Sequence, residues 1–416
     1  MEYTNFYNQK YIDICKRPQK YPVFKIEILD YSEFTIMDIT QDISLDSEGS
    51  ISVKYQQGVR RTCEFSVINI DQKYLPNENS MFWYHRKFRL YTGLKDQATG
   101  DIYWFSQGVF FVQNISCEKK ITHITGIDKF AAFTSDLGAS ILDVDYKISV
   151  IPEDRYSEQL SDEELKKLQQ QTPKIADVIR NILTIDKGNG YAIDPVIPII
   201  DSRLEDEPIP YDLTVGAGGF LGDMMIELAM MLGADIYYDT DGHLNLTKGT
   251  TDYLYVGQGV QWFFSPDKSD YISYTASYDI SKAINKIMVF GEGYEGVYNY
   301  ATVTNDNPKS PVRVSLVGIR QGESIETAMA YSPQKCEDYA KYYLKMKSII
   351  QLSADIECTF LPHLDVNRVI DIYDEFYSKS VEKHIIQSIT FPFNKSSMKI
   401  SATNVAVLPY YSSGVT

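Results

Sequence analysis

The feature that most constrains the fold is a long succession of short segments in which apolar and polar residues alternate. The first runs from Val23 to Ile28 and places Phe24 and Ile26 on the same face as Ile28. Alternation with a period of two is typical of a strand that buries one face. Turn residues separate the segments, so the region predicts a sandwich or a barrel. The other strands expected before residue 130 are Ile51–Lys54, Cys63–Asn69, Lys87–Thr92, Ile102–Phe105, Gly108–Glu118 and Ile121–Gly126.

The middle of the chain carries helix signals instead. A capping-box pattern at Ser161–Glu164 predicts a short polar helix. A second helix is expected within Thr172–Gly188, which opens with an N-cap threonine and a first-turn proline, and a third is expected over Gly219–Leu232. In Asp235–Thr247, two alternating runs flank the dipeptide Asp241-Gly242, which is a strong signal for a β-hairpin.

The strand pattern returns from Tyr271 to the end of the chain. One helix interrupts it, beginning at Ser332-Pro333 and running through Met346. The expected strands are Tyr271–Tyr278, Asn285–Phe290, Val297–Thr304, Val312–Gly318, Gln351–Phe360, Arg368–Tyr373, Lys383–Phe391 and Met398–Asn404.

These patterns predict a β-rich α+β protein with two antiparallel β regions, each a sandwich or a barrel, and a mixed helical region between them. The predicted divisions are an N-terminal arm (1–22) that orders only against something else, a first β-barrel (23–150), a mixed helical and hairpin region (151–270) and a second β-barrel with one inserted helix (271–416).

Composition excludes several classes of function. The chain has 416 residues with 40 Lys plus Arg against 56 Asp plus Glu, a net charge of −16, which disfavours a sequence-independent grip on nucleic acid. Five scattered cysteines without a C-x-x-C pair indicate neither a disulfide framework nor a zinc site. No apolar run reaches the roughly 18–20 residues of a membrane span, and the N-terminus is not a secretory signal. We expect a soluble protein made in a cytoplasm, without membrane insertion.

Three motifs could carry chemistry, and each has a simpler structural interpretation. Gly291–Gly296 spells G-x-G-x-x-G, but β-branched and aromatic residues follow it, so a hairpin loop is favoured over a nucleotide site. Gly216–Gly219 precedes a helix but lacks the lysine of a P-loop, which favours a tight packing loop. Asp239–Gly242 resembles part of a calcium loop, yet its glycine is fourth instead of sixth, which favours the hairpin.

The sequence contains no recognisable catalytic motif. The sequence has no G-x-S-x-G, no H-E-x-x-H and no papain-like cysteine, and its carboxylates are scattered. We therefore predict that the protein is not an enzyme, with no catalytic, cofactor-binding or metal-binding residues and no cofactor.

Several segments resemble a known family. Gly58–Asn69, Gln107–Val112 and Ile124–Phe130 resemble the N-terminal β-domain of phage tail baseplate hub proteins, the trimeric hubs of contractile tails, including prophage and tailocin types. Asp235–Leu246 is similar to the aspartate-glycine hairpin of that family. The similarity extends from about residue 20 to 410, and the remaining segments that carry it are Asn285–Gly291, Leu364–Asp374 and His384–Ile389. The chain ends at Thr416 without an appended peptidoglycan-cleaving or sugar-binding module, so we expect any cell-wall hydrolysis to belong to another protein.

The resemblance implies that both β regions are tube-like antiparallel β-barrel domains. It also implies a structural protein of the virion tail baseplate, assembled in the host cytoplasm. Its expected partners are two further copies in a homotrimer, the tail tube protein, the central spike protein and other baseplate proteins. Three copies with two similar β-domains each would present six near-equivalent surfaces and adapt a sixfold tube to a threefold spike. DNA would pass through the channel without specific binding.

Two alternatives stay open from the sequence. The first is a tail-tip adaptor of a non-contractile tail, which solves the same symmetry problem. The second, suggested by 32 tyrosines, is a carbohydrate-binding or carbohydrate-cleaving adhesin.

Overall fold

The computed structural model of the chain contains two compact units that each draw on separate stretches of sequence. The larger unit comprises residues 1–272, 357–369 and 386–400, and the smaller unit comprises 273–356, 370–385 and 401–416. The predicted division at residues 22, 150 and 270 stays a prediction. The structure describes residues 8–44, 49–77, 80–83, 86–138, 140–149, 172–209, 212–248, 259–279, 281, 283–291, 299–308, 310–327, 330, 332–348, 351–378, 380–404 and 412–414.

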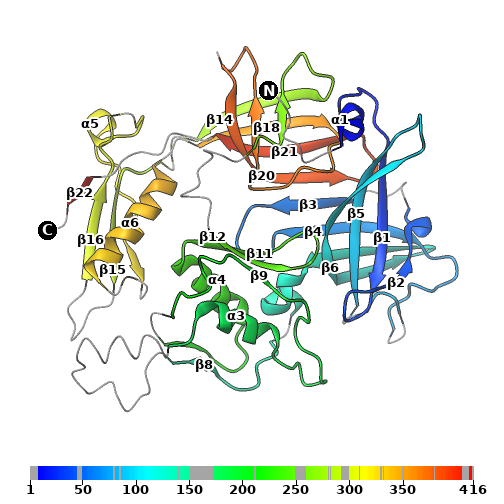
Figure 1. The fold of residues 1–416 in the computed structure, drawn as a ribbon, viewed down its shortest axis with the longest axis horizontal. Coiled ribbons are helices and arrows are strands. Elements are labelled where there is room, and N and C mark those ends of the chain that lie inside the picture. The colour runs from blue at the N-terminus through cyan, green and yellow to red at the C-terminus, as the bar shows by residue number, and fades with distance from the viewer. Residues whose placement is uncertain are drawn as a thin grey trace. The chain divides into compact units, whose positions relative to one another are not determined.

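The larger unit is built on a twisted, mainly antiparallel sheet (Figure 1). Its strands are hydrogen-bonded in the order β21-β20-β3-β4-β7-β6-β5-β1-β2. The predicted strands 102–105 and 108–118 form one strand, β6, which continues through a bulge opposite β5. The bounds are β1 Pro22–Leu29, β2 Thr35–Asp38, β3 Ser50–Lys54, β4 Arg61–Ile68, β5 Lys87–Lys95, β6 Ile102–Glu118, β7 Ile121–Asp128, β20 Glu382–Pro392 and β21 Ser397–Asn404.

Alternation produces the core of this sheet as the sequence predicts. Phe65, Phe88 and Phe110 are buried on one face, and the Phe88 and Phe110 rings stack with centroids 5.5 Å apart. Gly126 on β7 lies against this cluster, because a Cβ atom there would be 2.5 Å from Cζ of Phe88. At the β6 bulge the buried Gln107 turns inward and donates to Thr92 Oγ1 at 2.8 Å.

Short helical turns and a mixed helical module complete the larger unit. The helices predicted at 172–188 and 219–232 and the hairpin at 235–247 are confirmed as α3, α4 and β11–β12, while the helix expected at 161–164 lies outside the described residues. Apolar residues of α3, α4 and β11 share one buried cluster. The elements are η1 Thr40–Asp42, η2 Lys129–Phe133, η3 Ser135–Leu137, β8 Tyr146–Ile148, α3 Ile175–Leu183, β9 Ile199–Ile200, β10 Leu213–Val215, α4 Leu221–Met231, β11 Ala234–Tyr238, β12 Leu244–Lys248 and β13 Trp262–Phe264.

The N-terminal segment corrects one expectation. Residues 9–15, predicted to order only against something else, form helix α1 (Gln9–Cys15), which packs on the chain's own larger unit. Tyr11 is buried, and its hydroxyl lies 2.6 Å from Nδ1 of His363. Its ring also contacts Tyr103 and Phe105 at the start of β6. The apolar residues Tyr11, Ile12 and Ile14 therefore give this segment a core contact within the monomer.

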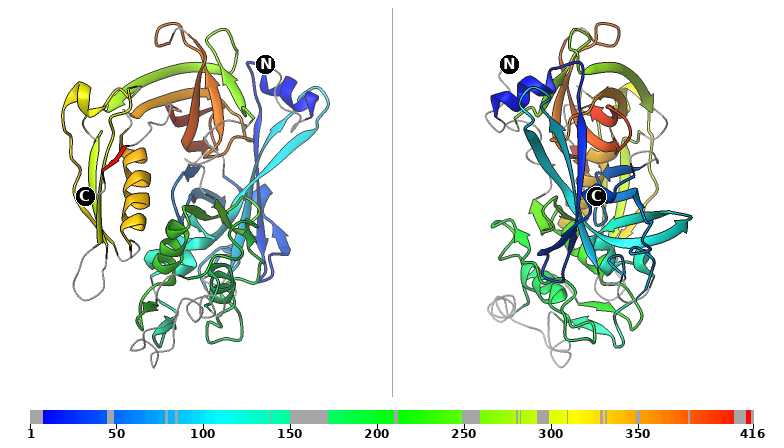
Figure 2. Two further views of the ribbon diagram at one scale, coloured as in Figure 1. Left: turned by 60° about the vertical axis from the view of Figure 1, so that its left-hand side comes forward. Right: turned by 90° about the vertical axis from the view of Figure 1, so that its right-hand side faces the viewer.

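Most of strands β14 and β18 lies in the smaller unit, which also contains a second sheet in the order β17-β15-β16-β22. Helix α6 lies along this second sheet, and Figure 2 shows the two side by side. The strand expected at 312–318 is wrong: Val314–Val317 is a short helix, α5, because asparagine side chains hold its flanks in a loop. The bounds are β14 Tyr271–Asp279, β15 Lys286–Gly291, β16 Asn299–Thr304, α5 Val314–Val317, β17 Ile325–Thr327, α6 Pro333–Lys347, β18 Gln351–Thr359, β19 Val369–Ile372 and β22 Ser412–Gly414.

The α+β, β-rich fold class is confirmed by this arrangement of large antiparallel sheets with few helices. Among the described helices, none is both long enough and apolar enough to cross a membrane.

Candidate functional site

The three glycine or aspartate motifs have structural roles in the residues described. Strands β15 and β16 pair antiparallel, as the hairpin interpretation of Gly291–Gly296 predicts, although most of that loop lies outside the described residues. Gly291 itself must be glycine, because a Cβ atom there would be 1.6 Å from the carbonyl oxygen of Ala330. In Gly216–Gly219, the N–H of Ala217 donates to Asp145 Oδ1 at 3.0 Å, so a carboxylate of the chain already occupies this loop.

The Asp239–Gly242 motif is the hairpin turn between β11 and β12, as predicted. Asp239 Oδ1 accepts hydrogen bonds from the N–H groups of Asp241 at 3.0 Å and His243 at 2.9 Å. Its Oδ2 accepts from the side-chain amide of Asn245 at 2.9 Å. Across the part of the chain that the structure describes, no three His, Cys, Asp or Glu side chains gather in a group that could hold a metal ion.

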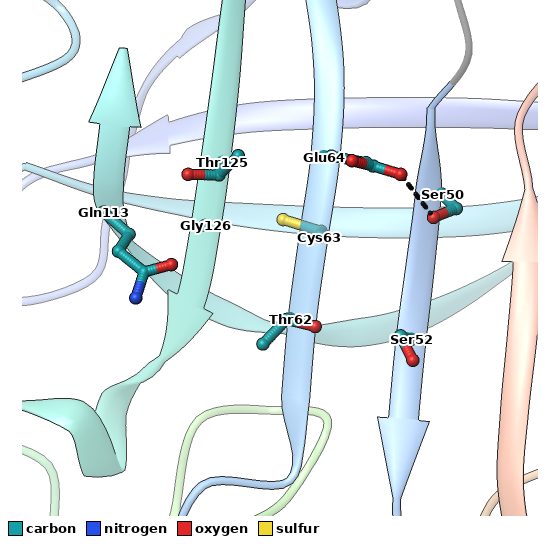
Figure 3. Close-up of a pocket in the computed structure, with 8 residues that line it drawn as sticks. All are labelled: Ser50, Ser52, Thr62, Cys63, Glu64, Gln113, Thr125 and Gly126. Atoms are coloured by element: carbon teal, nitrogen blue, oxygen red, sulfur yellow. Dashed lines mark hydrogen bonds between the residues drawn. The ribbon is translucent and has the colours of Figure 1, made fainter. Parts of the chain in front are cut away.

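The larger unit has a polar depression of about 340 Å³ on its sheet surface (Figure 3). Cross-strand register builds it: Ser50 and Ser52 on β3 lie opposite Glu64 and Thr62 on β4. Ser50 Oγ donates to Glu64 Oε1 at 3.1 Å. We call this surface the polar sheet face. Its lining residues are Ser50, Ser52, Thr62, Cys63, Glu64, Gln113, Thr125 and Gly126.

The chemistry of the polar sheet face favours contact with water over catalysis. Alternate residues of β4 are exposed, so Thr62 and Glu64 present polar groups to solvent, whereas Cys63 between them is buried at the base of the depression. Burial raises the pKa of the Cys63 thiol, so the reactive thiolate is disfavoured. Neutral hydroxyls and one carboxylate suit a hydrated surface.

A serine–histidine pair lies on the neighbouring strands, and sequence reasoning did not find it. Ser66 Oγ on β4 is 2.7 Å from Nδ1 of His123 on β7, because the two residues are register partners. Ser66 is only 2% exposed, so a substrate carbonyl has no path to its hydroxyl. The pair joins two strands and does not form an accessible nucleophile.

An ionic cluster is buried where the helical module meets the sheet within the larger unit. Its members are Glu33, Lys87, Lys129, Asp194 and Tyr238. Lys129 Nζ lies 2.5 Å from Glu33 Oε1 and 2.8 Å from Asp194 Oδ2, and Lys87 Nζ lies 2.7 Å from the same glutamate oxygen. Tyr238 donates to Asp194 Oδ2 at 2.6 Å.

This ionic cluster joins five separate parts of the larger unit: the β1–β2 turn, β5, η2, the loop after α3, and β11. Lys129 is 1% exposed and also donates to the carbonyl oxygen of Gly242 in the β11–β12 turn at 2.9 Å. Burial lowers the pKa of Lys87, and burial beside Asp194 raises that of Tyr238. Charges taken out of water need several partners each, and here every member has one or more. The cluster could not be predicted from the sequence, because its residues are far apart in the chain and no motif connects them.

A second cluster explains why the segments that carry the family resemblance lie together. Asp128 Oδ2 accepts from the backbone N–H of Arg60 at 2.6 Å and of Arg61 at 2.9 Å. Burial raises the pKa of Asp128 to about 6. The Arg60 guanidinium lies over the Tyr237 ring, with its carbon 3.6 Å from the ring centroid. Segments 58–69, 124–130 and 235–246 are thus joined through one arginine and one aspartate.

Comparison with known proteins identifies this fold. No protein-family model matches the chain, and no curated protein does. Among solved structures, the 43 kDa tail protein of prophage MuSo2 from Shewanella oneidensis matches with a TM-score of 0.53 and 13% identity, covering 91% of this chain and 98% of that one. A tail protein from Neisseria meningitidis MC58 matches with a TM-score of 0.54 and 10% identity, covering 92% and 96%.

A third structure extends the comparison beyond phages. A chain of the half-lidded Francisella PdpA-VgrG complex matches with a TM-score of 0.51 and 9% identity, covering 95% of this chain and 59% of that one. The resemblance expected from the sequence is therefore confirmed at the level of the fold: this chain has the fold of phage tail proteins.

Proposed function

We propose that this chain is a structural baseplate hub protein of a phage tail or of a tail-like injection machine. The observation that carries the proposal is the match to two tail proteins over at least 91% of this chain and 96% of each of theirs. A match of this extent covers the whole architecture and is not limited to one β-domain.

In the proposed assembly, three copies form a ring that adapts the sixfold tail tube to the threefold central spike. The regions 23–150 and 271–416 act as two tube-like domains, so that three chains present six near-equivalent surfaces, 3 × 2 = 6. Cyclic symmetry is sufficient to close such a ring, and no enzymatic reaction is needed. Large interfaces rich in tyrosine would hold the copies together.

The ring would leave a channel for DNA, and the polar sheet face is our candidate for its lining. Its eight lining residues include no Lys or Arg and one acid, Glu64. A surface without cations cannot gain affinity by releasing counterions from phosphates. The formal charge of a trimer, 3 × (−16) = −48, would also repel DNA. DNA would then pass without adhering.

The proposed partners are the tail tube protein, the central spike protein and other baseplate proteins. The Francisella chain with this fold is found in a complex of PdpA and VgrG, which supports assembly with other proteins. We propose a location in the virion tail baseplate, after assembly in the host cytoplasm. We propose a non-enzymatic role, because the fold is shared with tail proteins and the Ser66 hydroxyl and the Cys63 thiol are buried.

Native mass spectrometry of the purified chain, alone and with its tail tube protein, tests the proposal. We expect trimers, and complexes in which three copies bind six tube subunits. A chain that stays monomeric under both conditions contradicts the hub. If such a monomer also binds or cleaves cell-wall glycans, the adhesin alternative replaces it.

A further inference from the structure

The ionic cluster holds a lysine amine directly against a carboxylate inside the larger unit. Lys129 Nζ lies 2.9 Å from Oδ1 of Asp194 and 2.8 Å from Oδ2. A nitrogen that is nearly equidistant from the two oxygens lies close to the plane that bisects the carboxylate, and this plane contains the carbon Cγ. The amine therefore faces the one atom of Asp194 with which a nitrogen can form an amide bond.

The surroundings of this pair favour a neutral product. The side chains of Lys129 and Asp194 are 1% and 2% exposed. The desolvation cost of two buried charges is large, and their mutual attraction often fails to offset it. Conversion to an amide removes one positive and one negative charge from the interior. Glu33 keeps its other cations, Lys87 at 2.7 Å and the partly exposed Arg89 at 3.7 Å.

A second carboxylate is in place to accept a proton from the amine. Glu33 Oε1 lies 2.5 Å from Lys129 Nζ. An ammonium ion has no lone pair, so one proton must leave the nitrogen before it can attack carbon, and Glu33 is a base in contact with it. Glu33 also has a φ of +68°, a left-handed conformation that is unfavourable for glutamate. Backbone strain of this kind concentrates at functional sites.

Two neutral donors hold the carboxylate of Asp194. The backbone N–H of Val196 donates to Oδ1 at 3.1 Å, and the hydroxyl of Tyr238 donates to Oδ2 at 2.6 Å. Donors in these positions stabilise the negative charge that develops on the oxygens when a nucleophile adds to Cγ. The carbonyl oxygen of Gly242 accepts from Lys129 Nζ at 2.9 Å, which helps to fix the direction of the amine.

We propose that Lys129 and Asp194 form an intramolecular isopeptide bond, with Glu33 transferring the protons. The ionic cluster in the structure is the state before this reaction. The bond forms once per chain and within the chain, so it is compatible with a structural role. The inference goes beyond the hub function and does not depend on it.

The reaction is a condensation that needs no further reactant. Glu33 Oε1 takes one proton from the Lys129 ammonium group, and the neutral amine attacks Cγ of Asp194. A bond forms between Nζ and Cγ, and negative charge collects on the carboxylate oxygens. One of these oxygens leaves as water, with the proton returned by Glu33 and a second proton from Nζ. The third hydrogen stays on the amide nitrogen, and Glu33 is again a carboxylate.

The fold supplies the main requirement of this reaction, which is position. Groups held in attack geometry react as though present at effective concentrations of up to about 10⁵–10⁸ M. Lys129 and Asp194 are 65 positions apart in the chain and meet only in the folded state. The bond would join η2 to the loop after α3, and this link would persist in a denatured chain.

Intact-mass spectrometry of the denatured full chain tests the proposal. We expect the chain to be lighter by one water molecule than its sequence predicts. Digestion with trypsin should yield a branched peptide in which Lys129 is joined to Asp194. A chain that keeps its full mass overturns the proposal. A branch from Lys129 to Glu33, the other carboxylate on the nitrogen, also overturns it.

Two variants at the reacting positions sharpen this test. Lys129→Arg keeps a cation and should keep its full mass, whereas loss of water in this variant would place the reaction elsewhere and overturn the proposal. Asp194→Asn would release ammonia instead of water and give the same product as the unaltered chain. The two chains differ in mass before reaction and should reach one mass after it. Products of different mass would contradict the assignment of Asp194.

The role of Glu33 is tested by the rate of bond formation. The mass of freshly translated chain is followed with time, and tryptophan fluorescence reports folding in parallel. Glu33→Gln cannot accept the proton, so we expect bond formation to slow at least roughly a hundredfold after folding. The control is Glu27→Gln, which removes a glutamate of β1 that pairs with Lys25 outside the cluster, and it should leave the rate unchanged. Equal rates in the two variants would contradict proton transfer by Glu33.

Discussion

Replacing Lys129 by methionine should destabilise the larger unit more than any exposed charge change. Methionine keeps most of the volume of the side chain but removes the cation between Glu33 and Asp194, which are 6% and 2% exposed in their side chains. Breaking a buried ion pair on one side costs about 3–5 kcal/mol, because the remaining charge stays buried without its partner. Lys87 still pairs with Glu33, so we expect a loss near the lower end of that range.

Tryptophan fluorescence during urea unfolding measures this loss selectively. The three tryptophans, Trp83, Trp104 and Trp262, all belong to the larger unit, so their signal follows that unit. The control is Lys73→Met, which removes an exposed pair with Asp42 and should cost about 0–1 kcal/mol.

A double variant then separates the ionic cluster from general damage to packing. Adding Asp194→Asn to Lys129→Met removes the carboxylate left unpaired, so the combined loss should be smaller than the sum of the single losses. A Lys129→Met loss equal to that of Lys73→Met, or strictly additive losses, would refute the claim that this cluster joins the module to the sheet.

Three further predictions follow from local geometry. Gly126→Ala should destabilise the larger unit by about 1–3 kcal/mol in the same urea assay, because the new methyl group would meet Phe88; an unchanged midpoint would contradict this. Burial lowers the pKa of His363 to about 3, below its ordinary 6.5, so the folded state binds fewer protons and stability falls as pH drops from about 6.5 towards 3. His363→Gln should flatten this part of the urea midpoint–pH curve, and an unchanged slope would assign the effect elsewhere. Asn285→Ala should speed hydrogen exchange of the Arg320 amide and leave α3 unchanged, whereas equal acceleration in both would indicate global destabilisation.

Period-two alternation located most strands of the larger unit, because each strand buries one face against the same core. It missed the continuity of β6, since the bulge at Gln107 interrupts the pattern without ending the strand. It also misassigned Val312–Gly318, where β-branched residues favour a strand locally. There the tertiary hydrogen bonds of Asn285 to the Val312 and Gly318 carbonyls impose a short helix.

The polar sheet face can be predicted in part from the sequence, whereas the ionic cluster cannot. The alternation of β3 and β4 implies that Ser50, Ser52 and Glu64 share a face, so part of the polar sheet face follows from the pattern. The ionic cluster does not, because Glu33 and Asp194 are 161 positions apart and meet only through tertiary packing. Tyr11, Ile12 and Ile14 are apolar residues at helical spacing, which is a signal for helix α1. The polar residues around them and the prolines that follow led us to predict an arm instead.

Cryo-electron microscopy of the chain bound to its tail tube and spike tests the central claim most directly. We expect three copies in a closed ring, with regions 23–150 and 271–416 superimposable and alternating against six tube subunits, and with a lumen poor in Lys and Arg. Six copies in the ring, regions that do not superimpose, or a lumen lined by Lys and Arg would contradict the account.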